Sequence, residues 1–315
     1  MQAAFKTAVF AVAFAIATMS GAQAALLNLD AYIGGANVFS FNDFNAASSD
    51  VEGAIMAGGN VNVSHYTTNL KNKPAYGNYA MVVGGNLTYN NGGNIHNGDV
   101  YVGGTAALGI NMLDKGYEVK HGATPANIDM TRMASTLTTV SSELTHLATT
   151  GTAKEKWGGV FLTGTGTTGV EVINVDASWL VNSTYFDVSN VSSSATLIVN
   201  FIGSSVGFHG GFGEFDGLNV LFNTTASNVT INNGFHASLL APNAAINGGE
   251  GEVNGTIIVK SWDSTIQING TNAFKAADVP GLTTAVPEAD TYAMLLGGLG
   301  LLGFIARRRK QAAAR

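Results

Sequence analysis

The run Leu197-Ile198-Val199-Asn200-Phe201 decides the fold class, because short apolar runs of this kind return along the chain at a nearly constant interval. The runs start at residues 197, 219, 237 and 255, which is 22, 18 and 18 residues apart. Shorter β-like runs lie between them. A repeat of about 20 residues with two or three strands in each repeat predicts a mainly β fold, a β-solenoid (β-helix), whose coils bury their apolar sides by stacking.

Pairs of glycines give the N-terminal half a similar rhythm. The pairs are Gly58-Gly59, Gly84-Gly85 and Gly103-Gly104, and Asn60 and Asn86 follow the first two. Glycine allows a positive φ and a close approach of two backbones, so we expect these pairs at the corners of the coils. Asparagine after glycine suits a turn and can form side-chain ladders between coils. A β-sandwich with glycine-rich hairpins is the alternative architecture.

One segment departs from the β pattern. Its apolar positions are spaced by 3, 4, 3, 4 and 3 residues and so share one helical face; they are Met130, Met133, Leu137, Val140, Leu144 and Leu147. Thr124 is the expected N-cap, Pro125 the first helical residue and Gly151 the stop. We therefore expect one long α-helix at about residues 125–149, packed alongside the solenoid, with coils before and after it in sequence.

The composition narrows the range of functions. Charged residues make up 11% of the chain, the net charge is −6, and the sequence contains no cysteine. The lack of cysteine excludes disulfide scaffolds, cysteine-based zinc sites, iron–sulfur clusters and cysteine nucleophiles. Residues 25–286 hold 9 Lys and Arg against 19 Asp and Glu, a net charge of −10. A broad phosphate-binding surface needs clustered Lys and Arg, so the sequence predicts no nucleic-acid partner.

Residues 1–24 are organised like a signal peptide. Lys6 supplies the positive start, residues 8–17 are apolar, and Ala22-Gln23-Ala24 forms an A-x-A cleavage signal. The apolar run is shorter than the about 20 residues that a membrane span requires. We therefore expect export, with Ala22 and Ala24 marking the cleavage site and a mature chain that begins near Ala25.

The C-terminal end combines a linker, a short motif, an apolar segment and a basic end. Residues 279–291 contain Val286-Pro287-Glu288, the fourteen residues 293–306 carry no charge, and Arg307-Arg308-Arg309-Lys310 follows. Fourteen residues are marginal for a bilayer core of about 30 Å. The basic cluster is expected to stay in the cytoplasm. Residues 292–315 are thus predicted to be a transmembrane sorting segment with a basic end.

This order of export signal, body, motif, weak span and basic stop resembles the PEP-CTERM sorting signal of Gram-negative bacteria that make exopolysaccharide. The resemblance covers residues 286–310; its sorting residues are Val286, Pro287, Glu288, Arg307, Arg308 and Arg309. Ala289 stands where the family pattern has a second proline. The resemblance implies recognition by a membrane-embedded exosortase, cleavage near Pro287-Glu288, and transfer to the envelope or release. A permanent tail anchor is the alternative.

The body resembles the choice-of-anchor A domain. Residues 36–45 and 49–53 look like the opening of that domain, and residues 239–244 and 254–257 look like its later parts. The resemblance covers about residues 26–275, and it implies an adhesive surface domain in residues 25–278. It also implies an architecture similar to ice-binding-type β-solenoids with a helix alongside. No catalytic residues are attributed to that family.

Two local patterns suggest bound groups, and each has a simpler interpretation. Residues 164–169 fit the dinucleotide motif G-x-G-x-x-G, but a strand pattern rather than a helix follows them, which indicates a turn. Asp43, Asp50 and Glu52 form one acidic group, and the loop 209–217 forms a second polar cluster. Oxygen ligands of this kind suit Ca²⁺, whereas solvated loop carboxylates are the default interpretation. We therefore assign no cofactor, with Ca²⁺ as the alternative.

These observations favour a non-enzymatic exported protein of the cell surface or biofilm matrix of a Gram-negative bacterium. Flat faces rich in Asn and Thr can hydrogen-bond a repetitive polymer such as exopolysaccharide. An exported polysaccharide-active enzyme is one alternative, with Glu250 and Glu252 as its carboxylate pair, although residues 249–252 fit an exposed turn more simply. An ice-binding-type solenoid is the other alternative, for which the threonines of residues 165–168 are too few.

Overall fold

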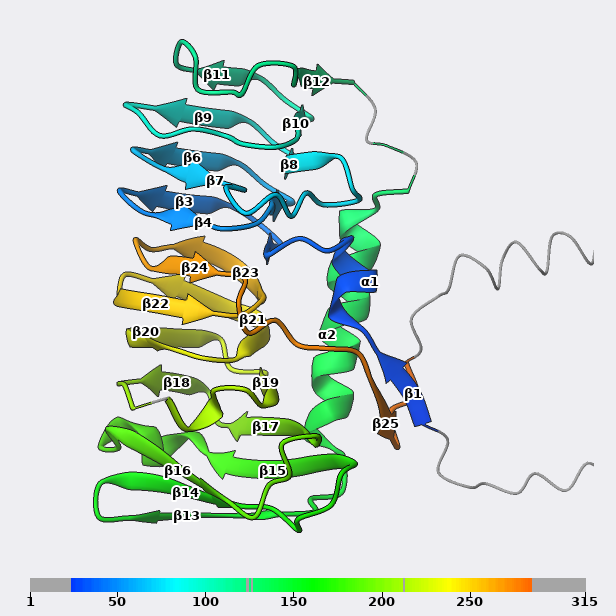
Figure 1. Cartoon of the computed structure of the whole chain (residues 1–315), viewed down its shortest axis with the longest axis vertical. Coiled ribbons are helices and arrows are strands. Elements are labelled where there is room, and N and C mark those ends of the chain that lie inside the picture. Colours follow the sequence, from blue (N-terminus) through cyan, green and yellow to red (C-terminus); the bar gives the residue numbers. More distant parts are fainter. Residues whose placement is uncertain (1–23, 123–124, 126, 212, 285–315) are drawn as a thin grey trace, which may run out of the picture.

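The computed structural model describes residues 24–122, 125, 127–211 and 213–284, and this part of the chain is mainly β with few helices. The mainly β class predicted from the sequence is therefore confirmed. The strands stack in rows along one long axis, with β12 at one end and β13 at the other, and a helix lies beside the stack (Figure 1). The rows belong to three ladders of parallel strands.

The first ladder faces the helix. From the β12 end its strands are β12 (Val119–His121), β10 (Asp99–Val102), β8 (Tyr79–Val83), β5 (Ile55–Ala57), β2 (Val38–Ser40), β23 (Ile257–Asp263), β21 (Ser238–Asn247), β19 (Asn219–Asn223), β17 (Thr196–Ile202) and β15 (Val170–Asp176). In β17, Leu197 packs inside the stack and Ile198 packs toward the helix. Strands buried on both faces need continuous apolar runs, which explains the runs seen in the sequence.

The second and third ladders contain the other parallel strands of the stack. The second contains β11 (Ala106–Leu108), β9 (Leu87–Asn90), β6 (Val61–Ser64), β3 (Phe44–Ala47), the ends of β23 and β21, β20 (Asn228–Phe235) and β18 (Ser205–Phe208). The third contains β7 (Thr67–Thr68), β4 (Asp50–Val51), β24 (Gln267–Asn269), β22 (Glu250–Asn254) and the end of β20.

The order of the rows in space differs from their order in the chain. β2, near the N-terminus, pairs with β5 on one side and with β23 on the other, so Val38 lies opposite Ile257. We call this junction the seam. From the seam, the first half of the chain forms the rows up to β12. The chain then continues through α2 to the β13 end of the stack, and its second half forms the rows from β15 and β17 back to the seam (Figure 1).

The long helix, α2 (Met130–Thr145), is shorter than the 125–149 segment predicted. Asp129 is its N-cap, and the Asp129 side chain accepts a hydrogen bond from the backbone N–H of Arg132 (3.0 Å). A carboxylate cap satisfies a free N–H of the first turn, which explains why the helix starts here and not at Pro125. Thr124 lies outside the described residues. His146 is the C-cap, and the backbone N–H of Gly151 instead donates to Val172.

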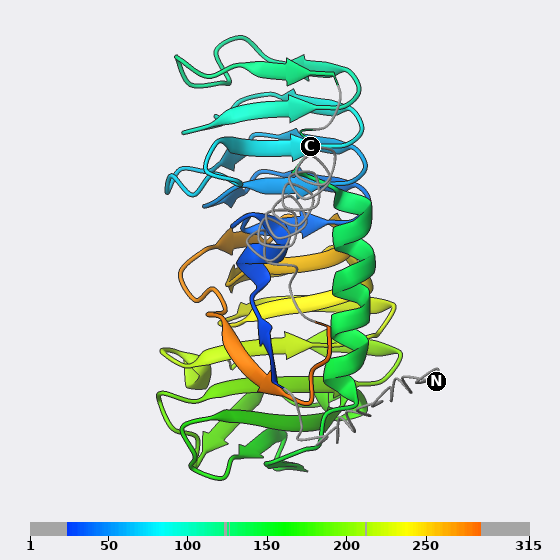
Figure 2. The same ribbon diagram turned by 90° about the vertical axis from the view of Figure 1, so that its right-hand side faces the viewer.

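The prediction that the helix packs alongside the coils agrees with the described arrangement (Figure 2). Leu137, Val140 and Leu144 of α2 are buried against the first ladder. A polar ladder runs beneath them: Asn223 donates to Asn200 (2.9 Å) and Asn200 donates to Asn174 (2.9 Å). The buried Ser141 hydroxyl donates to Asn223 (2.7 Å), and Asn200 also donates to the Leu144 carbonyl (2.8 Å). These bonds fix the position of α2 along the stack.

Short elements complete the fold. The β13 end of the stack is a three-stranded sheet of β13 (Thr152–Lys156), β14 (Gly159–Thr163) and β16 (Tyr185–Ser189), with the 3-10 helices Ala177–Val181 and Gly213–Phe215 nearby. β1 (Ala24–Leu27) pairs antiparallel with β25 (Ala277–Pro280), and α1 (Leu29–Ile33) follows β1. Inside the C-terminal half, buried phenylalanines fill the stack: Phe186, Phe201, Phe208, Phe215, Phe222 and Phe235.

Candidate binding surface

The glycine pairs lie at corners where successive rows approach closely. A Cβ added to Gly58, Gly84 or Gly103 would lie 2.2, 2.3 or 2.4 Å from a backbone oxygen of the preceding row. The expected corner position is therefore confirmed. The positive φ is not: these glycines are absent from the residues with left-handed backbone. Close backbone approach, rather than turn conformation, requires glycine here.

An Asx ladder follows the glycine corners. The Asp43 carboxylate accepts from the N–H of Asn60 (2.7 Å), the Asn60 side chain from the N–H of Asn86 (2.9 Å), and the Asn86 side chain from the N–H of Thr105 (2.8 Å). The ladder predicted after the glycines is thus present, with side chain to backbone bonds. It locks the rows in register where they enter the second ladder, and it occupies the Asp43 carboxylate.

The exposed side of the second ladder carries a straight column of polar residues, which we call the polar face. In adjacent rows the strand pairing places Asn247 opposite Asp263, Asp263 opposite Asn45, Asn45 opposite Asn62, and Asn62 opposite Thr88. Neighbouring strands lie about 4.8 Å apart, so amide, carboxylate and hydroxyl groups repeat at this interval. A shallow depression of about 460 Å³ crosses the column at the seam.

The individual residues of the polar face were not found from the sequence, although flat Asn- and Thr-rich faces were expected. The signal was present: after the corners at Gly58-Gly59 and Gly84-Gly85, polar residues alternate with buried apolar ones in β6 and β9. Period-two alternation marks a strand with one solvated side. The part contributed by Asn247 and Asp263 could be added only once the pairing across the seam was known.

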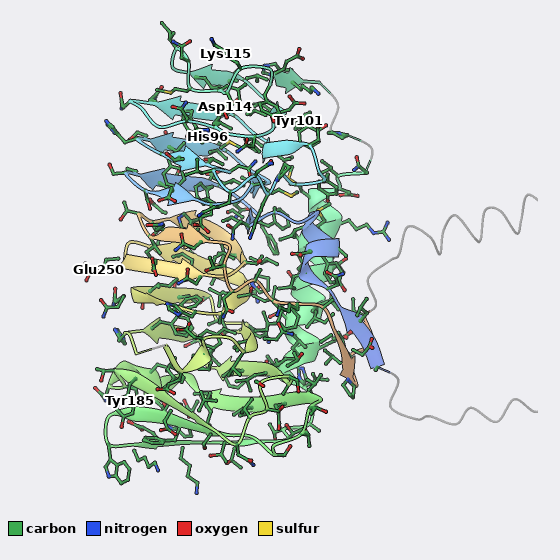
Figure 3. All side chains as sticks on the ribbon, viewed as in Figure 1. His96, Tyr101, Asp114, Lys115, Tyr185 and Glu250 are labelled. Carbon is green, nitrogen blue, oxygen red and sulfur yellow. The ribbon has the colours of Figure 1, made fainter. Side chains whose placement is uncertain are left out.

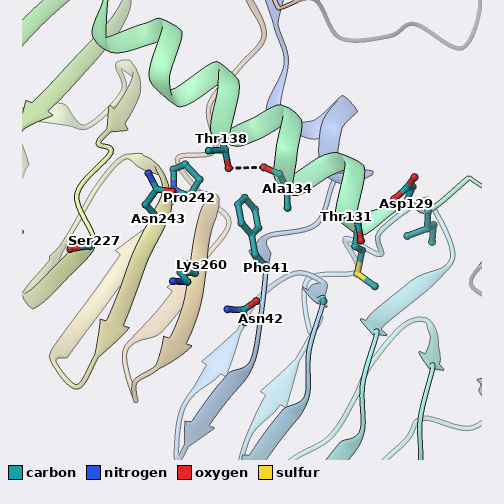
Figure 4. A pocket seen from close by; sticks show the side chains of 13 residues that line it. Phe41, Asn42, Asp129, Thr131, Ala134, Thr138, Ser227, Pro242, Asn243 and Lys260 are labelled. Carbon is teal, nitrogen blue, oxygen red and sulfur yellow. Dashed lines mark hydrogen bonds between the residues drawn. The ribbon is translucent and has the colours of Figure 1, made fainter. Parts of the chain in front are cut away.

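A groove of about 780 Å³ lies between α2 and the corner of the rows (Figure 4). Phe41 and Lys260 line it from the strand side, and Thr131 lines it from the helix. Asp129 is the acidic residue among those that line it, and this carboxylate already caps α2. Within the part of the chain that the structure describes, the groove therefore lacks the second carboxylate that sugar hydrolysis by acid and base would require.

Two of the acidic residues considered for Ca²⁺, Asp43 and Glu52, already accept hydrogen bonds. The Glu52 carboxylate accepts from the N–H of Gly270 (3.0 Å) and lies 3.7 Å from Lys71. Burial raises the pKa of the Asp50 carboxyl, and the Glu52 charge raises it further. Within the described residues, no group of three or more His, Asp or Glu side chains is arranged to hold a metal ion.

His209, Gly210 and Gly211 line one side of a small polar pocket of about 250 Å³, and residues 233–236 of the neighbouring row line the other. Asn233 donates its side-chain amide to the carbonyl of His209 (3.1 Å), and Asp216 pairs with His236 of the neighbouring row. Phe212 lies outside the described residues. Both side-chain contacts join adjacent rows, so they stabilise the stacking of these rows.

Glu250 and Glu252 lie in a strand, β22, and not in the exposed turn expected from the sequence. Pairing with both β20 and β24 draws this glycine-rich segment into the third ladder. Glu252 accepts hydrogen bonds from Asn254 and Asn269 (both 3.2 Å), whereas Glu250 is exposed at the outer edge (Figure 3). Neither residue lines the groove along α2.

The G-x-G-x-x-G match at residues 164–169 is the loop between β14 and β15, which confirms that it is a turn. Thr165 donates to Glu171 through both its N–H and its hydroxyl (2.7 Å each). Burial alone would raise the pKa of Glu171, but hydrogen bonds from Thr150 and Thr165 lower it below its ordinary value. The Thr165 hydroxyl is therefore not part of an exposed threonine array.

The two ends of the body lie side by side, because Ala24 pairs with Pro280 in the β1–β25 sheet. The Glu143 carboxylate of α2 accepts from the N–H and the hydroxyl of both Thr283 and Thr284. Ala24 is the first residue of β1, whereas the other predicted cleavage and sorting residues lie outside the described residues: Ala22, Val286, Pro287, Glu288, Arg307, Arg308 and Arg309. Among the helices of the described part, none is long and apolar enough to cross a membrane.

The described part of the chain is a stack of parallel rows with one exposed polar side. The chain belongs to the family described as "Putative Ice-binding-like adhesive domain", whose model matches residues 31–270. Residues 285–310 match the PEP-CTERM protein-sorting motif. No curated protein and no solved structure matches the chain. The two matches identify an exported bacterial surface protein that is processed by an exosortase.

Proposed function

We propose that the protein is a non-enzymatic adhesin of the cell surface or biofilm matrix, which binds exopolysaccharide through the polar face. The in-register column from Asn247 to Thr88 carries this proposal. Exopolysaccharides repeat hydroxyl groups along an extended chain, and a flat array with a repeat of about 4.8 Å can bond many of them at once. Individually weak bonds then add up along the polymer.

The proposal extends to the scaffold and the host. The three parallel ladders support a β-solenoid with α2 alongside, the architecture expected of a choice-of-anchor A domain. The PEP-CTERM match supports export by a Gram-negative bacterium and exosortase cleavage near Pro287-Glu288. The A-x-A pattern of residues 22–24 supports cleavage by signal peptidase after Ala24. Mass spectrometry of the envelope-associated protein tests the processing. A mature form that retains the peptide with Arg307, Arg308 and Arg309 would show a permanent anchor instead.

Binding is tested with the processed protein and the exopolysaccharide of the producing cells. The double substitution Asn45→Leu and Asn62→Leu removes two neighbouring amides of the polar face. Loss of two hydrogen bonds at about 0.5–1.5 kcal/mol each corresponds to about a tenfold weaker affinity. The matched control is Ser135→Leu with Thr139→Leu on the exposed side of α2, which adds the same apolar area elsewhere. Equal affinities of the two variants would contradict the proposal.

A further inference from the structure

The β13 end of the stack carries an aromatic cluster, separate from the polar face, in which Trp157 is exposed and Phe161 and Tyr185 are partly buried. Trp157 is 82% exposed, and its ring lies 5.8 Å from that of Phe161 between centroids. The Phe161 ring lies 5.8 Å from that of Tyr185, and both contacts are edge-to-face. Figure 3 shows Tyr185 at this end of the stack. Exposed aromatic clusters on a soluble surface mark interaction sites.

Tyr185 is held on the sheet by the absence of a side chain at Gly159. A Cβ on Gly159 would lie 2.4 Å from the Tyr185 ring, so the ring covers this position. The Tyr185 hydroxyl donates to the carbonyl of Trp157 at 3.5 Å. These two contacts hold the ring over Gly159.

Trp157 occupies a turn position that disfavours it. Trp157 and Gly158 form the two-residue turn between β13 and β14, with φ of 53° and 76°. Two positive φ values are characteristic of a type I′ hairpin turn, for which Asn-Gly is the preferred sequence. Bulky side chains rarely adopt a positive φ, and most other non-glycine residues that do so here are asparagines. A strained residue of this kind points to a function for its side chain.

Two lysines make the cluster basic within an acidic body. The Lys156 ammonium lies 4.6 Å from the centroid of the Trp157 ring and 3.9 Å from that of Phe161. Lys156 is in register with Gly159, and Lys154 with Phe161, so both lysines share the aromatic side of the sheet. Asp187 pairs with Phe161 on the same side and is the acidic residue there. Positive charge beside flat rings suits an anionic ligand with apolar C–H faces.

We propose that Trp157, Phe161, Tyr185, Lys154 and Lys156 form a binding site for the pyranose units of an acidic polysaccharide. The C–H faces of the sugars stack on the aromatic rings, and the sugar carboxylates pair with the lysines. The site rests on the proposed function, because it assumes a polysaccharide ligand. It adds the ligand class, a polymer of uronic acid, and a second contact at the end of the stack.

The test uses the processed protein, with polygalacturonate as the acidic probe and dextran as the neutral one. Trp157→Asn removes the indole and installs the preferred turn sequence. We expect at least tenfold weaker binding of polygalacturonate, measured by calorimetry, together with a higher melting temperature. The matched control is Ile110→Ala, since Ile110 is 92% exposed near the opposite end of the stack. We expect this control to bind as the wild type does.

The outcomes separate this site from the polar face. A Trp157→Asn variant that binds polygalacturonate as tightly as the wild type overturns the site, even where Asn45→Leu with Asn62→Leu still abolishes exopolysaccharide binding. A lower melting temperature for Trp157→Asn also overturns it, because Trp157 is then structural. Lys154→Gln with Lys156→Gln should weaken polygalacturonate binding and reduce its salt dependence. Equal binding of dextran and polygalacturonate by the wild type contradicts the acidic ligand class.

Discussion

The indole of Trp262 stacks on the ring of Phe44 across the seam, with centroids 6.1 Å apart and ring planes 6° apart. Both side chains are fully buried, and their strands pair in parallel with these two residues in register. Trp262 lies in the last part of the folded body and Phe44 in the first. Their contact joins the two halves into one stack, so the polar face runs across the seam without a break.

Trp262→Ala should destabilise the protein by about 3–5 kcal/mol, because a large buried side chain is lost and a cavity remains. Urea unfolding followed by far-UV circular dichroism measures this change. Val181→Ala, at a site 69% exposed, is the control and should change stability by less than about 0.5 kcal/mol. An unchanged midpoint for Trp262→Ala would show that the seam is not packed as described.

Asn200→Ala should cost about 2–3 kcal/mol, since it interrupts the buried ladder and removes the bonds of Asn200 with Asn174, with Asn223 and with the Leu144 carbonyl. Chemical denaturation gives the difference in unfolding free energy. Asn228→Ala, on the exposed side of β20, provides the comparison with near-wild-type stability. If both variants are equally stable, the ladder contributes nothing to the packing of α2.

Gly84→Ala tests close approach at the corners. The new methyl group would lie 2.3 Å from the carbonyl oxygen of Gly58, so the backbone must move, and we expect a loss of about 1–3 kcal/mol. Gly169→Ala is the matched control, because nothing lies within 4 Å of its Cβ position. The melting temperatures should fall for the first variant and stay level or rise for the second. A lower melting temperature for Gly169→Ala than for Gly84→Ala would show that the backbones of adjacent rows do not approach closely at Gly84.

Glu143 should make stability depend on pH in the acid range. Burial alone would raise its pKa, but hydrogen bonds from Thr284 and Thr283 lower the pKa to about 2, below the ordinary 4.5. The stabilisation is therefore complete above about pH 4.5 and is lost as the pH falls toward 2. Unfolding measured at pH 6 and at pH 2.5 should show Glu143→Gln to be less stable than wild type at pH 6. The difference in unfolding free energy between wild type and variant should be smaller at pH 2.5. A difference that does not change with pH would refute stabilisation through the bonds of Glu143 with Thr283 and Thr284.

Local features of this fold could be predicted from the sequence, because they depend on nearby residues. The apolar run at residues 197–201 indicates a strand that is buried on both faces, and the glycine pairs indicate the corners of the rows. The apolar positions from Met130 to Leu147 indicate a helix. Its first residue is set by the Asp129 N-cap, which the apolar spacing does not show. The spacing of apolar side chains thus predicts that a helix or strand is present better than it predicts the first and last residues of that helix or strand.

The seam and the surfaces could not be predicted in the same way. A repeat shows that coils stack, but it does not say which coil meets which, so the pairing of Val38 with Ile257 was not evident. The polar face depends on that pairing, because its residues come from both sides of the seam. The shallow depression that crosses the polar face depends on the pairing for the same reason. The aromatic site was not found from the sequence, because the position of Tyr185 over Gly159 depends on the parallel pairing of β14 with β16.

The lack of cysteine in the chain allows the most direct test of the polar face, because a single introduced cysteine can carry an environment-sensitive fluorophore. Asn90→Cys places the label beside Thr88 on β9, and Ser135→Cys places it on the exposed side of α2. Titration with exopolysaccharide should shift the emission of the Asn90→Cys protein and leave that of the Ser135→Cys protein unchanged. A shift confined to the helix label, or no shift at either label, would contradict binding through the polar face.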